Sequence, residues 1–225
     1  MPGRIQPLVT GEIYHVFNLG IAHGPTFTDK REYLRAKNVL WYYRFASLPV
    51  RFSYFSVLNQ DERVSLTREL NISGEKLIDC LCFCFMPNHF HFLVRQVKDN
   101  GISKFMSNFQ NSYTRYFNTK NSRLGQLFLD QFKATRIETE EQLLHISRYI
   151  HLNPYTAYVV KTLSDLETFP WSSLGEYFNP KKFQISESQT IVSQFKTAID
   201  YKKFVFDQAD YQRQLDGIKH LTLEG

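Results

Sequence analysis

The chain has 225 residues, of which 43% are hydrophobic, and carries a formal net charge of +5 at pH 7. This length suits one large domain, or one domain with an appendage. The chain contains no run of about 18 apolar residues, which excludes a transmembrane helix. Its first residues also lack the apolar segment of an export signal. We therefore expect a cytoplasmic protein with no membrane partner.

The first half of the chain shows both strand and helix patterns. Residues 12–18 have the composition of a strand. Asp29 is a typical N-cap for a helix that continues to about residue 46, with apolar positions at helical spacing. Residues 50–58, rich in Phe, Tyr and Val, predict a second strand. A short helix is expected over residues 61–70.

The middle of the chain predicts a strand hairpin followed by a long helix. Residues 77–85 alternate as a strand, residues 86–88 form a turn, residues 89–95 return, and a helix covers residues 102–117. Cys80, Cys82 and Cys84 occupy alternate positions, so we expect a small apolar stripe on one face of a reduced protein. The order of elements predicts an α+β fold: a ferredoxin-like antiparallel sheet with helices packed on one face and the 89–95 strand at its centre.

Two histidines on the returning strand are the most informative feature of the sequence. Side chains alternate between the faces of a strand, so His89 and His91 point to one side while Phe90 and Phe92 enter a core. Imidazole binds Mn, Zn and similar ions, and two imidazoles on a rigid strand form half of a metal site. The alternative is a half-buried strand whose polar face carries two histidines.

A predicted helix that starts near Thr139 offers a third ligand and a reactive group. Thr139 and Gln142 match a capping box, and Pro154 places Asn153 near a helix end or kink. Tyr149 and Asn153 are one turn apart and share a face. If the Asn153 amide completes a site with the histidines, the ion would polarise a phosphodiester while the Tyr149 phenolate attacks. The alternative is a boundary aromatic followed by a helix stop.

Basic residues interleaved with Phe and Tyr follow the histidines. Phosphate neutralisation combined with aromatic stacking is how proteins hold single-stranded nucleic acid. Solvated helix faces are the alternative for any one of these residues. The basic residues between the histidines and position 150 that carry this pattern are Lys104, Arg115, Lys120, Arg123, Lys133, Arg136 and Arg148. The candidate DNA contacts among them are Arg115, Arg123, Lys133, Arg136 and Arg148, together with the aromatic Tyr116.

Seven short segments carry a family resemblance. They are YHVFN at 14–18, FMPNHFHFLV at 85–94, YTRYFN at 113–118, GQLF at 125–128, FKA at 132–134, RYIHLNP at 148–154 and WSS at 171–173. The chain resembles the single-tyrosine HUH transposases, and most closely the REP-associated tyrosine transposase branch of bacteria. The resemblance covers roughly residues 8–178 in family order. The Met-Pro-Asn-His-x-His and Tyr-Ile-x-x-Asn-Pro motifs are specific in combination.

The resemblance implies a DNA-cleaving and rejoining enzyme, a metal-dependent endonuclease and strand transferase acting at hairpin-flanked sites. Tyr149 matches the nucleophile that forms a 5′-phosphotyrosine link. His89, His91 and Asn153 match the metal ligands, with Mg²⁺ or Mn²⁺ as the ion. The implied partner is single-stranded or hairpin DNA. Relatives are often homodimers, although members of the REP-associated branch can act as monomers. Residues 1–178 would form the transposase domain, and residues 179–225 a helical appendage that includes a helix over about 197–215.

Some features depart from this family or compete with it. Leu19 stands where many family members carry Arg. Tyr113 and Tyr116 also follow the histidine strand, but neither has a ligand-type residue four places on, so we interpret them as core or base-stacking aromatics. A non-catalytic protein that binds hairpin DNA or RNA with the same fold is the alternative function. A metal-dependent hydrolase of small phosphoesters is a third, disfavoured by the lack of a carboxylate-rich cluster.

Overall fold

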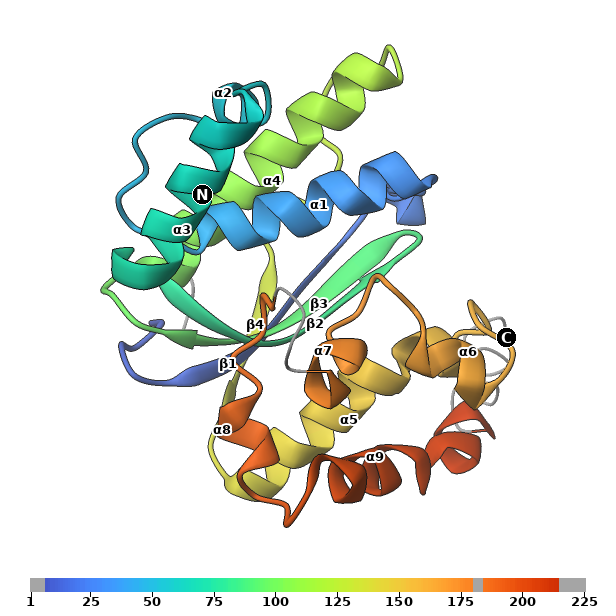
Figure 1. The fold of residues 1–225 in the computed structure, drawn as a ribbon. Coiled ribbons are helices and arrows are strands. Elements are labelled where there is room, and N and C mark those ends of the chain that lie inside the picture. Colours follow the sequence, from blue (N-terminus) through green and yellow to red (C-terminus); the bar gives the residue numbers. More distant parts are fainter. Residues whose placement is uncertain (1–6, 180–183, 215–225) are drawn as a thin grey trace.

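A four-stranded antiparallel sheet forms the centre of the computed structural model, which describes residues 7–179 and 184–214 (Figure 1). The strands lie in the order β2-β3-β1-β4. They are β1 (Ile13–Leu19), β2 (Ile78–Met86), β3 (His89–Gln96) and β4 (Lys133–Ile137). Helical crossovers follow β1 and β3, which is the β-α-β-β-α-β arrangement of ferredoxin-like folds. The predicted α+β class is confirmed, and the histidine strand β3 has an inner position.

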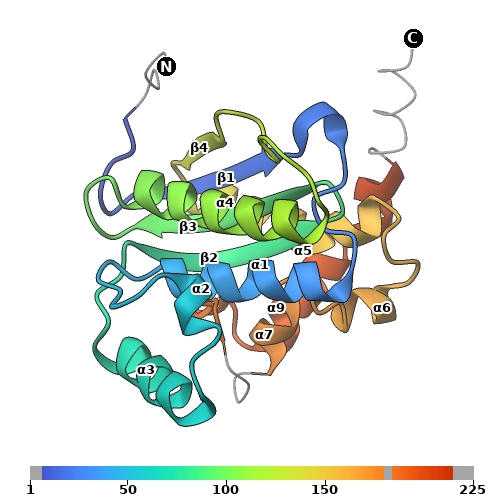
Figure 2. The ribbon, with the colours of Figure 1, turned by 90° about the horizontal axis from the view of Figure 1, so that it is seen from above.

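Two long helices, α1 (Lys30–Tyr43) and α4 (Gly101–Lys120), lie side by side over one face of the sheet (Figure 2). Helix α1 begins at the predicted cap, because the Asp29 side chain accepts a hydrogen bond from the Glu32 N–H. Beneath the helices, Phe90 and Phe92 of β3 are fully buried in an aromatic core with α4 residues such as Phe109. Their burial confirms that these two phenylalanines point into a core.

A second helical layer covers the opposite face of the sheet, so the prediction of helices on one face only is wrong. It contains α5 (Glu140–Thr156), α6 (Leu163–Glu167), α7 (Leu174–Phe178), α8 (Gln189–Val192) and α9 (Ala198–Phe206). That face of the sheet also carries buried apolar side chains, among them Leu81, Cys82 and Leu93, which need a cover. Tyr201 and Val205 of α9 join the same core.

Residues 50–58 do not form the predicted strand. They contain the short helix α2 (Phe52–Phe55), which precedes α3 (Gln60–Ser73); a single 3-10 turn (Ile21–His23) follows β1. Phe52 and Phe55 are three residues apart and both buried, and their rings pack against Tyr42 of α1. The helical spacing of the two phenylalanines therefore prevails over the strand propensity of the residue types.

The three cysteines do not share a face, which corrects the predicted stripe. The pairing of β2 with β3 shifts between Cys80 and Cys82, so that Leu81 is an extra residue in β2. Because of such a bulge, the strand residues before it point to the opposite face of the sheet from the one that strict alternation predicts. Cys80 consequently packs in the core beneath α1 and α4, whereas Cys82 and Cys84 pack on the α5 side.

The ends of two predicted helices differ in detail from the sequence pattern. Thr139 caps α5 by accepting from the Gln142 N–H, but the Gln142 side chain accepts from the Glu138 N–H, so only half of the capping box forms. Helix α9 follows its cap Thr197 and ends at Phe206. Residues 209–214 are helical again, and position 215 lies outside the described residues. None of the described helices is long and apolar enough to cross a membrane.

Candidate active site

His89 and His91 lie on the face of β3 that α5 covers, as the strand alternation predicts. Their ring centroids are 4.9 Å apart and the two rings are nearly perpendicular. His91 is only 4% exposed. Because β3 is an inner strand paired on both sides, its backbone holds the two imidazoles in a fixed relation to each other.

Hydrogen bonds orient both imidazoles in the same way. His91 Nδ1 lies 2.9 Å from Nε2 of His15, which reaches it from the neighbouring strand β1. His89 Nδ1 lies 2.7 Å from Asn88 Oδ1. An amide oxygen only accepts, so His89 Nδ1 carries the proton. Both bonds use Nδ1. The Nε2 lone pair of His89 is therefore left as a ligand atom for a metal ion, and the same holds for His91 in the tautomer whose Nδ1–H donates to His15.

Burial keeps these histidines neutral. It lowers the pKa of His15 to about 4 and the pKa of His91 well below the ordinary value. The pKa of His89 is lowered to about 4, mainly by burial, although the neighbouring Asn153 amide acts in the opposite direction. All three rings are therefore neutral at pH 7, and the neutral imidazole is the form that binds metal ions.

Helix α5 brings Tyr149 and Asn153 to the histidines within one chain. The Tyr149 ring centroid lies 5.4 Å from that of His91 and 6.1 Å from that of His15, edge-on to both. Asn153 is 5% exposed, and its Oδ1 is buried with no hydrogen-bond partner. A buried amide oxygen without a partner is rare, because it loses its hydration without compensation. Next to the His89 imidazole, such an oxygen fits the third ligand of a divalent ion.

A histidine on another face of α5, two residues after Tyr149, holds the helix against the rest of its layer. His151 is fully buried; its Nδ1 lies 2.7 Å from the Tyr201 hydroxyl of α9, and its Nε2 lies 2.8 Å from Ser173 Oγ. The Ser173 hydroxyl in turn accepts from the backbone N–H of Phe83 in β2. This chain of bonds fixes the position of α5 relative to the sheet, and with it the position of Tyr149 relative to the histidines.

The described residues contain no group of three or more His, Cys, Asp and Glu side chains that could hold a metal ion. A metal at the histidine pair would therefore need a ligand of another type, as the Asn153 amide provides. Residues 42–153, about half of the chain, match the model of the family described as IS200-like transposases. The chain belongs to this family. The match includes both histidines, Tyr149 and Asn153, and it confirms the relationship that the sequence motifs predicted.

The IS200-like family member shares its fold with a solved REP-associated tyrosine transposase that is bound to a REP hairpin. The two chains are 13% identical, the TM-score is 0.51, and the similarity covers 88% of this chain and 96% of the other. A comparison with curated protein sequences gives no match. At this low identity the structural likeness bears on the fold alone.

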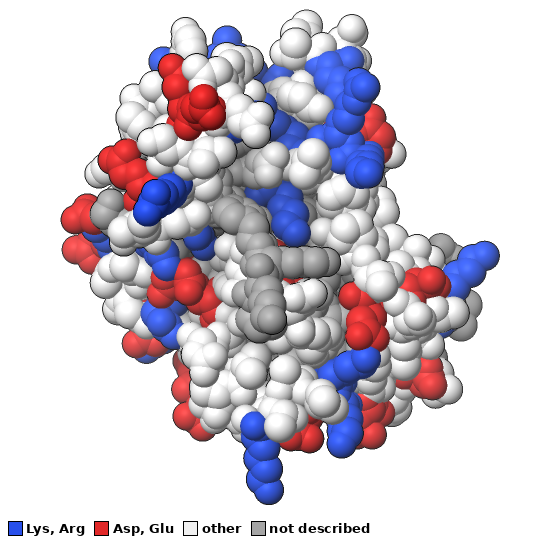
Figure 3. Space-filling view, in the orientation of Figure 1, with Lys and Arg blue, Asp and Glu red and all other residues white. Residues whose placement is uncertain are grey.

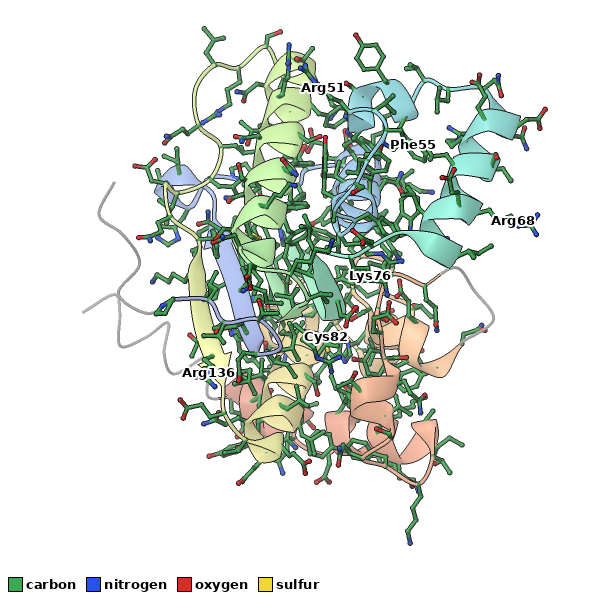
Figure 4. All side chains as sticks on the ribbon, turned by 90° about the vertical axis from the view of Figure 1, so that its left-hand side faces the viewer. Arg51, Phe55, Arg68, Lys76, Cys82 and Arg136 are labelled. Carbon is green, nitrogen blue, oxygen red and sulfur yellow. The ribbon has the colours of Figure 1, made fainter. Side chains whose placement is uncertain are left out.

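The basic residues predicted to bind DNA are spread over the surface and interior of the protein rather than gathered at the histidine site. Lys133 is exposed, and its Nζ lies 5.8 Å from the Phe17 ring, which is itself 5.6 Å from His91. Arg136 lies on the edge strand β4 (Figure 4) and pairs with Glu12 at 2.8 Å. Of the predicted DNA contacts, all of which lie within the described residues, only Lys133 lies beside the histidines.

The other predicted contacts lie on helices. Arg148 is buried, with its guanidinium 4.3 Å from the centre of the Phe204 ring, so little of its surface is left for a phosphate. Arg123 donates to Asn118 Oδ1 and shapes the loop after α4. Arg115 and Tyr116 belong to α4, on the face of the sheet opposite Tyr149. Lys and Arg side chains gather over the ends of α1 and α4 at the upper right of Figure 3.

His15 is the residue at this site to which the sequence analysis assigned no role. It is 76 positions from His91 in the sequence, and only the register between β1 and β3 brings the two rings together. The available signal was the alternation of β1, which puts His15 and Phe17 on one face. That pattern could not show which residue of β3 lies opposite them.

Proposed function

We propose that the protein is a metal-dependent single-stranded DNA endonuclease and strand transferase with Tyr149 as its nucleophile. The observation that carries this proposal is the position of Tyr149 beside His91 in the same chain. The Tyr149 ring lies edge-on to two neutral imidazoles, and a buried amide oxygen that could hold a cation lies on the same helix one turn further on. The same arrangement suits phosphoryl transfer to a phenol.

His89, His91 and Asn153 would hold the ion, and Mg²⁺ or Mn²⁺ is the species we propose. When bound, it would polarise the scissile phosphodiester and stabilise the charge that develops there. The contribution of His15 is to keep the His91 proton on Nδ1, so that Nε2 stays available. The contribution of the His151 contacts is to keep α5, and therefore Tyr149, at a fixed distance from the sheet.

The proposed cleavage step is a transesterification. The Tyr149 oxygen forms a bond to phosphorus while the bond from phosphorus to the 3′-oxygen breaks. The phenol loses its proton, and the departing 3′-oxygen gains one. The products are a 5′-phosphotyrosine and a free 3′-hydroxyl, and attack by a 3′-hydroxyl on the phosphotyrosine reverses the step. Energy is conserved in the ester, so rejoining needs no nucleotide cofactor.

Hairpin DNA with single-stranded flanks is the proposed substrate. The solved protein with the same fold is bound to a hairpin, and Lys133 beside the histidines offers a contact for a phosphate. Arg123 and Arg136 stay predictions as further phosphate contacts. Because Tyr149 and the histidines meet within one chain, cleavage would not need the tyrosine of a second copy, whether or not the protein forms a homodimer.

The test is incubation with end-labelled single-stranded hairpin DNA from the region that flanks the gene, with and without Mn²⁺. Denaturing electrophoresis should reveal a protein–DNA adduct only with the ion. Tyr149→Phe should abolish the adduct, whereas Tyr155→Phe, a matched change on the same helix, should preserve it. If the hairpin binds but no adduct forms with Mn²⁺ or, in a parallel incubation, with Mg²⁺, the protein is the non-catalytic hairpin-binding alternative.

A further inference from the structure

A large hollow lies between α1, α2 and α4, on the face of the sheet opposite Tyr149. Its volume is about 880 Å³, which is within the usual range of ligand sites. Figure 4 shows Arg51 between α4 and α2, with α5 on the other side of the sheet. The arginines and tyrosines that line the hollow are Arg35, Arg51, Arg115, Tyr43, Tyr54 and Tyr116.

The arginines give the hollow a positive charge that no nearby carboxylate balances. No Asp or Glu is among its lining residues. Within residues 7–179 and 184–214, no carboxylate lies within 4.0 Å of the guanidinium groups of Arg35, Arg51 or Arg115. The Arg35 guanidinium stacks on the Tyr116 ring at 4.9 Å, and its buried Nε has no hydrogen-bond partner. Three cations around one concavity attract an anionic ligand.

Aromatic surfaces stand beside these cations. Tyr54 is 64% exposed at the rim, and Tyr116 is half-buried on the wall. A second hollow of about 690 Å³ continues along α4, shares Arg115 with the first, and adds Arg123. Cations spaced along a surface beside accessible aromatic rings are the pattern by which proteins hold a nucleic-acid strand: the cations bind phosphates and the rings stack on bases.

We propose that this hollow is a second DNA site, which binds a run of unpaired nucleotides remote from the nucleophile. Unpaired nucleotides fit better than a duplex, because a base must leave its stack before its face can reach Tyr54 or Tyr116. The strand continues past Arg115 into the second hollow. The proposal rests on the proposed function for the identity of the ligand as DNA, but it requires no cleavage.

The test is fluorescence anisotropy with labelled oligo(dT), using the full chain with Tyr149→Phe as parent so that no adduct can form. Arg51→Ala and Tyr54→Ala should each weaken binding about fivefold or more, and Tyr54→Phe should stay within about twofold of the parent. Arg51→Ala combined with Arg115→Ala should reduce the slope of log K against log salt by about 1.4, because each phosphate that is no longer neutralised accounts for about 0.7 of that slope.

Two exposed residues outside the hollow provide matched controls, Arg68→Ala on α3 (Figure 4) and Tyr211→Ala. Both should bind oligo(dT) as the parent does. The proposal is overturned if the hollow variants bind like the controls, or if they lose affinity for a blunt duplex as strongly as for oligo(dT). Failure of adduct formation by the wild-type protein would leave this measurement intact. If the wild-type protein forms the adduct but the hollow variants bind oligo(dT) as the parent does, the second site is refuted and the proposed function stands.

Discussion

Replacing His15 tests whether its bond to His91 prepares a metal ligand. His15→Phe keeps a ring of similar size, which can still stack on Phe17, but removes the acceptor for the His91 Nδ1–H. Loss of such an outer partner typically weakens metal binding 10- to 100-fold, or about 1.4–2.7 kcal/mol. We therefore expect this loss of Mn²⁺ affinity, measured by calorimetric titration at pH 7 without DNA. His15→Gln, which retains an acceptor, should recover part of it.

Two controls make the His15 result interpretable. The variant leaves a buried N–H of His91 unpaired, so its free energy of unfolding should also fall by about 1–3 kcal/mol; circular dichroism must show that it is folded at the titration temperature. His145→Ala, at an exposed histidine of α5, should bind Mn²⁺ like the wild type. Equal Mn²⁺ affinity of His15→Phe and wild type would refute the argument that His15 orients a ligand.

Three further changes test the core, the α5 layer and the proposed third ligand. Burial raises the pKa of Glu32, but hydrogen bonds from Asn121, Lys120 and Thr28 outweigh it and the pKa is lowered overall. The stabilisation from this lowered pKa is present above the pKa of the unfolded state and is lost as the pH falls through the pKa of the folded state. Glu32→Gln should therefore lower the free energy of unfolding by about 2 kcal/mol at pH 7, and its free energy of unfolding, measured by urea denaturation, should depend less on pH on the acid side. Tyr201→Phe leaves the His151 bond unmade and should cost about 1–3 kcal/mol in the same assay; an unchanged free energy of unfolding would mean that α9 does not anchor α5. Asn153→Leu should raise the urea midpoint of the metal-free protein, because the unpaired oxygen is removed, and should also weaken Mn²⁺ binding; a lowered midpoint would show that the amide is structural.

The elements of the site were predictable because they follow local rules. The strict alternation of a strand puts His89 and His91 on one face, and the helical spacing of four residues puts Tyr149 beside Asn153. Each inference needs only a few neighbouring residues and the geometry of one element. The family motifs then linked the two elements, which are far apart in the sequence.

What the sequence could not supply depends on register and on packing between distant segments. The extra residue Leu81 moves Cys80 to the other face of the sheet, and the spacing of the cysteines does not indicate this bulge. Phe52 and Phe55 become helical because α1 offers an aromatic surface to both rings. The second helical layer was missed because the sequence of a helix does not show against which face of a sheet the helix packs.

Peptide mapping of the covalent product tests the central claim most directly. The wild-type protein is incubated with Mn²⁺ and a single-stranded hairpin substrate, the adduct is digested with nuclease and protease, and the peptides are examined by mass spectrometry. We expect a nucleotide attached through its 5′-phosphate to the tyrosine at position 149. A nucleotide carried by another residue, such as Tyr113 or Tyr116, would contradict the account.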